Sequence, residues 1–388
     1  MGKIAQFYGG YYQASGGIET HITEIIQNLD YEFEVLTDAL SSYKMIEKPC
    51  SNVTIQRFKP YNYSYNPSKS MMTSKITFPY RVLTDIQRIK NKHKFLRKNS
   101  FDLVHFHGSG AGDAVTKLSY LLNSTNIVSK LSDFSDLEPK ILTVHGLSSL
   151  LTNNPMVKKQ EMDFIRQFKS IICVDQKLYD YLNNELKNNA KLWCVPNSVN
   201  TNKFKYVPIY SHDKLKVGFI GRLEASRGIA LLYDLINNLP SYIDLYVLGA
   251  GNAKDIERFK SKVDVSRIHF QENIAYEQIP YFLQQLDILF NPVIAEGISR
   301  VTLESMSTGR PVIMLNYGNR YPVIHNKTGY LINYDIRELL NLLEYIYNAP
   351  EEMEKIGINA KKEIESKYDS KIVIPKIKDI YEELLNEN

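Results

Sequence analysis

Two glutamates lie eight positions apart in the stretch AEGISRVTLES, residues 295–305. The stretch follows LDILFNP (286–292), which has the composition of a buried strand, and we expect the next helix to begin near Ser299. Glu296 then lies in the loop, and Glu304 lies about 7.5 Å along the helix axis. Carboxylates accept hydrogen bonds from hydroxyl groups, and amides at a helix start bind phosphate. The pattern predicts a site for a ligand with both groups, such as a nucleotide sugar; the alternative is a surface loop with a capping acid.

Two arginines flank the turn that follows the run LKVGFIGR (215–222). Arg222 ends the run, and Arg227 precedes Gly228 at the start of a helix that we expect over 226–239. Cations at these positions can converge on one point at the carboxyl edge of a sheet, where a diphosphate would bind both of them. Solvated surface arginines are the alternative.

Glycines open the first expected helix, directly after the run KIAQFY (3–8). Gly16 and Gly17 stand where this helix begins, and backbone amides at such a turn suit a phosphate. The spacing matches neither the dinucleotide-binding fingerprint nor the phosphate loop of nucleoside triphosphatases. A tight turn without a ligand is equally compatible with the pattern.

Three histidines stand at the ends of two expected strands. His105 and His107 close the run DLVHFHG, and His145 closes KILTVHG. A histidine at the end of a parallel strand lies over the crevice of the sheet, where it can bond to a substrate. A buried structural role is the alternative. A zinc site is a further alternative, but no cysteine or carboxylate nearby has the spacing of a zinc ligand, so we expect no metal.

The elements that position these residues follow a simple alternation. Runs of β-branched and aromatic residues, separated by helix-length segments, predict an α/β fold with parallel sheets and crossover helices. The runs are 3–8, 31–37, 53–58, 102–108, 140–146, 170–175, 191–197, 215–222, 244–251, 267–273, 286–292, 311–318 and 328–334. Two such series predict two doubly wound domains, separated by the polar stretch 198–214.

The tail of the chain, 370–388, has the pattern of an amphipathic helix with Ser370 as its N-cap. The apolar face of this helix carries Ile374, Ile377, Tyr381 and Leu384.

Composition narrows the class of protein. The chain has 388 residues, 44% of them hydrophobic and 23% charged, as in ordinary globular proteins. The chain has three cysteines, which is an odd number, and they lack the spacing of metal ligands. This pattern indicates a reducing compartment. We see no signal peptide and no apolar run long enough to span a membrane, and we therefore expect a cytoplasmic protein.

One segment, 51–100, is strongly basic, with eleven cations against the single acid Asp85. Tyrosines and two methionines are interleaved with these cations. The pattern is typical of a solvated lysine-rich helix, or of a surface that meets anionic lipid headgroups or a phosphate-bearing acceptor. We expect no nucleic-acid partner, because no recognition motif accompanies the charge.

Together these motifs resemble the family 4 retaining glycosyltransferases of the GT-B fold. The matching segments run from residue 16 to 313 in the family's order. They are GGIETHITEIIQNL, DLVHFHG, ILTVHG, VPNSVNTNKF, VGFIGRLEASRGIALL, LYVLGAG and EGISRVTLESMSTGRPVI, the last of which fits the family's Glu-x7-Glu signature. The resemblance implies two Rossmann-like domains, 1–205 on the acceptor side and 206–368 for the nucleotide sugar, with the helix 369–388 returning to the first.

Roles for single residues also follow from the resemblance. The residues implied to bind the donor are Gly17, Arg222, Arg227, Asn273, Ile274, Glu296, Gly297, Ile298, Ser299 and Glu304. Among these the arginines would bind the diphosphate, Glu296 the donor sugar and Glu304 the ribose. His145 would lie near the reacting centre, and His107 would share the acceptor side with it. The chain departs from the family at Ser198, at Asp175 and at Gly146.

The resemblance implies a hexosyltransferase that moves a sugar with retention of configuration onto a glycan, a lipid-linked acceptor or a polysaccharide, at the inner face of the membrane. The candidates for the reacting centre are His145, Glu296, Arg222 and Arg227, acting in a front-face reaction. No two aspartates are two positions apart, so the metal–diphosphate motif Asp-x-Asp is absent, and we expect no metal or other cofactor. The alternatives are a GT-B epimerase, a phosphorylase, or a non-catalytic partner subunit.

Overall fold

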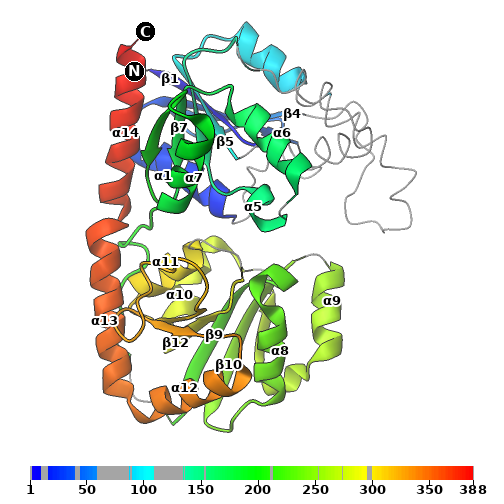
Figure 1. Ribbon diagram of the computed structural model, residues 1–388, viewed down its shortest axis with the longest axis vertical. Helices are drawn as coiled ribbons and strands as arrows, with labels where there is room; N and C mark the ends of the chain where they lie inside the picture. The colour runs from blue at the N-terminus through cyan, green and yellow to red at the C-terminus, as the bar shows by residue number, and fades with distance from the viewer. Residues whose placement is uncertain are drawn as a thin grey trace. The chain divides into compact units, whose positions relative to one another are not determined.

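The computed structural model (Figure 1) shows a chain that folds into two compact units. The described residues are 2–9, 16–39, 44–58, 87, 90–108, 134, 136–152, 154–209, 213–251, 253–272, 274–294 and 299–387. The first unit comprises Met1–Pro196 with Ile374–Asn388, and the second comprises Asn197–Val373. The predicted boundary after residue 205 falls inside the second unit, because Val199 forms a parallel bridge with Asp369.

The first unit contains an eight-stranded sheet among the residues that the structure describes. Its order is β3 (Ile46–Cys50), β4 (Val53–Phe58), β2 (Glu32–Asp38), β1 (Lys3–Phe7), β5 (Leu103–His107), β6 (Lys140–Val144), β7 (Ser170–Cys173) and β8 (Lys191–Cys194). All neighbouring pairs are parallel except β3 with β4. The sequence did not predict β3, whose residues Lys48 and Pro49 are typical of an edge strand rather than a buried one.

Helices cover both faces of this sheet. The described helices of this unit include α1 (Gly17–Asn28), α5 (Ser148–Thr152), α6 (Pro155–Ile165), α7 (Gln176–Leu186) and α14 (Ser370–Asn386). On one face Phe106 and Leu142 pack with Met162 of α6 and Leu178 of α7. Asp175, a departure from the family pattern, accepts a hydrogen bond from the backbone N–H of Leu178 and caps α7. Aspartate is as good an N-cap as serine or threonine, so the departure leaves the helix start intact.

The opposite face is joined to α14 by a buried polar contact. Tyr381 is fully buried, and its hydroxyl lies 3.1 Å from Nε2 of Gln6 and 2.5 Å from Nδ1 of His105. The apolar face predicted for the tail is buried: Ile374, Ile377, Tyr381 and Leu384. The C-terminal helix therefore supplies part of the core of the first unit.

The second unit contains a six-stranded parallel sheet among its described residues. Its order is β11 (His269–Glu272), β10 (Ile243–Ala250), β9 (Leu215–Arg222), β12 (Ile288–Asn291), β13 (Val312–Leu315) and β14 (Tyr330–Ile332). The chain forms β9 first and adds β10 and β11 on one side of it. It then crosses to the other side of β9 and adds β12, β13 and β14 there, so the order of the strands reverses between β9 and β12. In doubly wound sheets a ligand-binding crevice lies at such a switch point, beyond the carboxyl ends of the strands.

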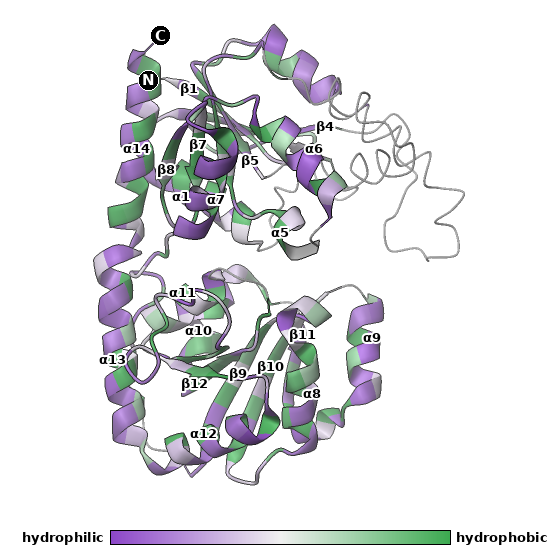
Figure 2. Ribbon diagram, in the orientation of Figure 1, coloured by the Kyte–Doolittle hydropathy of each residue, from purple (hydrophilic) through white to green (hydrophobic). Residues whose placement is uncertain are grey.

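Two hydrophobic cores lie on the two faces of this sheet (Figure 2). The helices are α8 (Ile229–Asn237), α9 (Ala253–Lys262), α10 (Ile279–Gln284), α11 (Arg300–Ser307), α12 (Ile336–Asn348) and α13 (Pro350–Lys367). Val217 and Leu245 pack on the face covered by α8 and α12, and Leu289 and Met314 pack on the face covered by α10, α11 and α13. The inner strands β12 and β13 are thus buried on both sides, which explains why their sequences are almost continuous apolar runs.

The described part of the basic segment is less exposed than its composition suggests. Residues 59–86, 88 and 89 lie outside the described residues. Arg57 and Lys92 are buried, and they form ion pairs with Glu47 and Asp38 at 2.8 and 2.5 Å. These two cations therefore serve the packing of the first unit rather than a surface. No helix among the described residues is both long and apolar enough to cross a bilayer.

Replacing Tyr381 by phenylalanine should destabilise the protein. The change removes one hydroxyl from a fully buried position and leaves Gln6 and His105 without that partner. An unsatisfied buried group costs about 1–3 kcal/mol, which should appear as a lower unfolding free energy in urea titrations followed by circular dichroism. The matched control is Tyr281→Phe in α10, because the Tyr281 side chain is 69% exposed. Equal stability of the two variants would contradict this account of α14.

Candidate active site

The switch point of the second unit brings two arginines together. Arg222 is the last residue of β9, its guanidinium is 59% exposed, and it lies 3.0 Å from Oε1 of Glu224. Arg227 ends the short helix η2 (Ala225–Arg227). Burial, and then the charge of Arg222, lower the pKa of Arg227 against the opposing effect of Glu224. Two positive charges that act on each other in this way favour the binding of an anion.

Glycine at position 228 fixes this turn. Its φ of +70° is left-handed, and a Cβ built there would lie 1.9 Å from the carbonyl oxygen of Pro292. The predicted helix 226–239 is therefore wrong at its start, because η2 ends and α8 begins on either side of Gly228. The N–H of Ile294 donates to the carbonyl of Ser226 at 3.2 Å. The loop after β12 is thus held against the arginine turn.

The helix start predicted near Ser299 is confirmed. Ser299 is the N-cap of α11, with φ −74° and ψ 148°, and its side chain makes no capping hydrogen bond. Instead Asn291, at the end of β12, places Nδ2 2.9 Å from Oγ of Ser299 and 2.9 Å from Oγ1 of Thr302. Asn291 thereby fixes the beginning of α11 relative to the sheet, with the positive end of the helix dipole at the carboxyl edge.

Glu304 is buried in α11 and already has polar partners. Its Oε1 accepts a hydrogen bond of 2.8 Å from the Tyr276 hydroxyl, and Nε of Arg300 lies 3.7 Å away. Burial, and then the Glu304 charge, raise the pKa of Tyr276. Arg300 had no role from the sequence; in the structure it pairs with the carboxylate one turn along the same helix. The sequence also missed Tyr276, whose only signal was an aromatic residue shortly after an expected strand.

The remaining predicted donor residues fall into two groups. One group lies outside the described residues: Asn273, Glu296, Gly297 and Ile298. Ile274 is half-buried against the core that contains α10 and α11. Gly17 is the first residue of α1 in the other unit.

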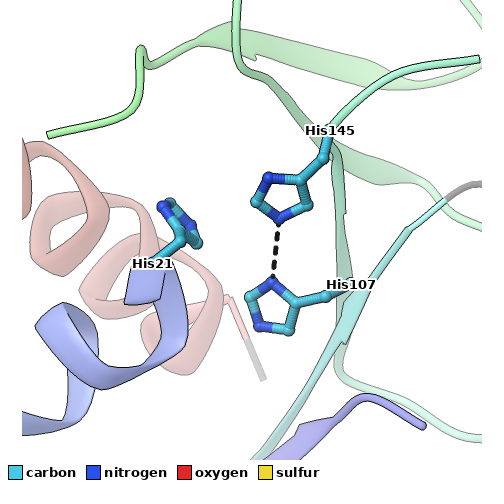
Figure 3. Close-up of side chains that lie close together, drawn as sticks. All are labelled: His21, His107 and His145. Atoms are coloured by element: carbon cyan, nitrogen blue, oxygen red, sulfur yellow. Dashed lines mark hydrogen bonds between the residues drawn. The ribbon is translucent and has the colours of Figure 1, made fainter. Parts of the chain in front are cut away.

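In the first unit, the strand ends bring three histidines together, as Figure 3 shows. His107 ends β5, His145 follows β6, and the third member is His21 of α1. Nδ1 of His107 lies 3.4 Å from Nε2 of His145, and the ring centroids of His21 and His145 are 4.8 Å apart. The structure therefore brings His107 and His145 together, as their positions at strand ends predicted. His21 was missed because it lies among the buried isoleucines of α1.

His105 has a structural role instead. Its Nε2 lies 2.7 Å from Oγ1 of Thr143, and its Nδ1 lies 2.5 Å from the Tyr381 hydroxyl. Burial, with a smaller contribution from His145, lowers the pKa of His105 to about 3. A ring that is neutral and bonded on both sides belongs to the core, which is the alternative that the sequence left open for it.

Comparison with known proteins identifies the class of enzyme. Residues 214–348, which span the arginine turn and α11, match the glycosyl transferases group 1. The uncharacterized glycosyltransferase MJ1069 of Methanocaldococcus jannaschii is 23% identical over 413 residues, covering 99% of each chain. The chain is a glycosyltransferase, and its residues 214–348 are similar to the group 1 family. A second relative of this glycosyltransferase is the UDP-Gal:alpha-D-GlcNAc-diphosphoundecaprenol alpha-1,3-galactosyltransferase of Escherichia coli, 22% identical over 375 residues, with 90% of this chain and 91% of the relative covered.

Solved structures agree on the fold of this glycosyltransferase. Anabaena Alr3699/HepE, in complex with UDP-glucose, superposes with a TM-score of 0.70 at 15% identity, over 99% of this chain and 100% of that one. The two doubly wound units therefore form the GT-B fold, as the sequence predicted. Arg222, Arg227 and Glu304 all lie within the part of this glycosyltransferase that matches the family.

Proposed function

We propose that this glycosyltransferase moves a hexose from a nucleotide-diphosphate sugar to a glycan, lipid-linked or polysaccharide acceptor, with retention of configuration. The observation that carries the proposal is the turn after β9, where the positive charge of Arg222 acts on Arg227 and where Ile294, in the loop between β12 and α11, donates a hydrogen bond to Ser226. A diphosphate neutralises both arginines and also lies at the positive end of a helix.

The same turn would stabilise the leaving group during sugar transfer. As the bond from the anomeric carbon to the diphosphate breaks, negative charge grows on the leaving oxygen. Preorganised cations and amides at that point stabilise the charge without having to reorient, which is the largest contribution in many enzymes. The leaving group can then assist attack from the same face, which gives retention. His145 and His107 are proposed for the acceptor side, and Glu304 for the ribose.

The relatives support the two substrates separately. HepE is bound to UDP-glucose, and the name of the E. coli relative specifies a UDP-sugar donor and a diphosphoundecaprenol-linked acceptor. We extend the chemical classes of donor and acceptor to this chain, and not the particular sugars.

Release of nucleotide diphosphate separates the proposal from its rivals. A thermal-shift screen of UDP-, GDP- and ADP-sugars first identifies a donor, because a ligand that binds only the folded state stabilises it. Release of diphosphate from that donor is then measured with and without a lipid-linked acceptor. A transferase needs the acceptor for most of the release. An epimerase would interconvert the donor without an acceptor, a phosphorylase would require phosphate, and a partner subunit would release nothing.

Substitution of either arginine by alanine should reduce kcat/KM by about 10- to 100-fold, since a charge-assisted hydrogen bond contributes about 1.5–3 kcal/mol. The matched control is Arg337→Ala in the same unit, because the Arg337 side chain is 87% exposed. Steady-state transfer rates at varied donor concentration give the comparison. Loss of activity in the control, or full activity in both Arg222→Ala and Arg227→Ala, would refute the assignment.

Chelation should leave transfer unchanged. We propose that protein cations meet the charge of the leaving group, because the chain lacks the Asp-x-Asp motif that would hold a metal on the diphosphate. The measurement is the transfer rate before and after treatment with EDTA. A rate that disappears with EDTA, while the circular dichroism spectrum stays constant, and returns with Mg²⁺ or Mn²⁺ would contradict the metal-independent reaction.

We further propose that the basic segment brings the enzyme to an anionic membrane surface on the cytoplasmic side, where a lipid-linked acceptor would be found. Helical residues 90–98 carry exposed cations in the described part of the segment. Those cations are Lys90, Lys94, Arg97 and Lys98.

The triple variant Lys90→Gln, Lys94→Gln and Lys98→Gln should float less with anionic vesicles, because each cation near the surface contributes about 1 kcal/mol. Vesicle flotation with and without anionic lipid measures the effect. The control removes the same charge from exposed lysines of the second unit: Lys254, Lys327 and Lys355. Equal recovery of the two triple variants, or recovery that does not depend on anionic lipid, would overturn the proposal.

A further inference from the structure

Three imidazole rings from distant parts of the sequence meet in the first unit. His21 comes from α1, His107 from the end of β5, and His145 from the residue after β6 (Figure 3). Each ring offers one nitrogen, and these three nitrogens all lie within 4.8 Å of one another. His21 and His107 are buried, and His145 is half-buried. The donor site proposed above does not include His21, and it does not explain why the three rings lie together.

The protonation of His107 follows from its neighbours. Its Nε2 lies 2.7 Å from Oε1 of Gln6, and the amide nitrogen of Gln6 donates to the hydroxyl of Tyr381 at 3.1 Å. Because the Gln6 oxygen can only accept, Nε2 of His107 carries the proton and donates it. The lone pair of His107 is therefore on Nδ1, the atom that lies 3.4 Å from Nε2 of His145.

The distance between the His107 and His145 nitrogens matches the geometry of a bound metal ion. Zinc lies about 2.0–2.1 Å from histidine nitrogens, so two nitrogens in a tetrahedral site are about 3.4 Å apart. Gln6 supplies the outer hydrogen bond that commonly orients a ligating histidine.

We propose that His21, His107 and His145 form a binding site for Zn²⁺, with three protein ligands and a fourth position open. Imidazole nitrogens suit Zn²⁺ and similar transition metals, whereas Mg²⁺ prefers oxygen ligands. The site belongs to the first unit, and the arginine turn belongs to the second. His107 and His145 are also proposed for the acceptor side, so the test of this site measures metal binding and not activity.

The competing interpretation is a polar cluster without a metal, in which Nε2–H of His145 donates to Nδ1 of His107. Both arrangements give the same short distance between the two rings. They differ in whether the third ring, His21, is needed: a metal uses all three rings, and the hydrogen bond uses two.

The experiment titrates metal-free full-length protein with Zn²⁺ by calorimetry and with Co²⁺ by visible absorption, with Mg²⁺ as the negative probe. We expect one equivalent of Zn²⁺, a tetrahedral Co²⁺ spectrum and no heat from Mg²⁺. His21→Ala should weaken Zn²⁺ binding at least 100-fold. Gln6→Leu should weaken it about 10- to 100-fold, as losses of outer hydrogen bonds to metal ligands do.

The matched control removes two histidines from the second unit, His269→Asn with His325→Asn, since both are exposed. Its affinity for Zn²⁺ should equal that of the wild type. If His21→Ala does not fold, His145→Asn replaces it, because that position is half-buried and leaves the helix intact. The absence of saturable Zn²⁺ binding by the wild type, or equal affinity in the wild type and the histidine cluster variants, would overturn the site.

Discussion

The hydroxyl of Tyr381 is the contact on which the first unit depends. Strand periodicity places His105 and His107 on the same face of β5. Gln6 of the neighbouring strand β1 lies in register with His105. Polar groups buried on a sheet face need partners, and a single phenol from α14 joins Gln6 to His105. The end of the chain therefore completes the polar face near its beginning, and through Gln6 it also fixes the orientation of His107.

The two units have the same kind of sheet but opposite chemistry at the edge. In the second, the strand edge carries two arginines of like charge, and an anionic ligand, as proposed, would relieve the repulsion between them. In the first, burial lowers the pKa values of His105 and His107, so these rings offer lone pairs and hydrogen-bond donors rather than charge. A phosphate-rich substrate suits the second edge, whereas hydroxyl groups or a soft cation suit the first.

The sequence predicted those parts of the fold and of the candidate site for which a residue pattern has only one physical interpretation. The parallel strands, the start of α11 at Ser299 and the approach of Arg222 to Arg227 all followed from apolar runs and strand ends. The predictions that failed concerned residues whose contacts lie far apart in the sequence. Gly228 breaks a predicted helix because Pro292 approaches it closely. His21 sits on an apolar helix face, where periodicity alone gives a core residue.

Glu304 shows why a buried functional group is harder to interpret than an exposed one. Its carboxylate already accepts from Tyr276 and lies near Arg300, both inside the second unit. Removal of one partner of a buried ion pair costs about 3–5 kcal/mol, because the other charge remains without compensation. A substitution of Glu304 would therefore combine a loss of the proposed ribose contacts with a loss of stability. Arg222 is more than half exposed, so its loss reports on the donor more directly. The arginine turn is consequently the part of the site at which function can be separated from folding.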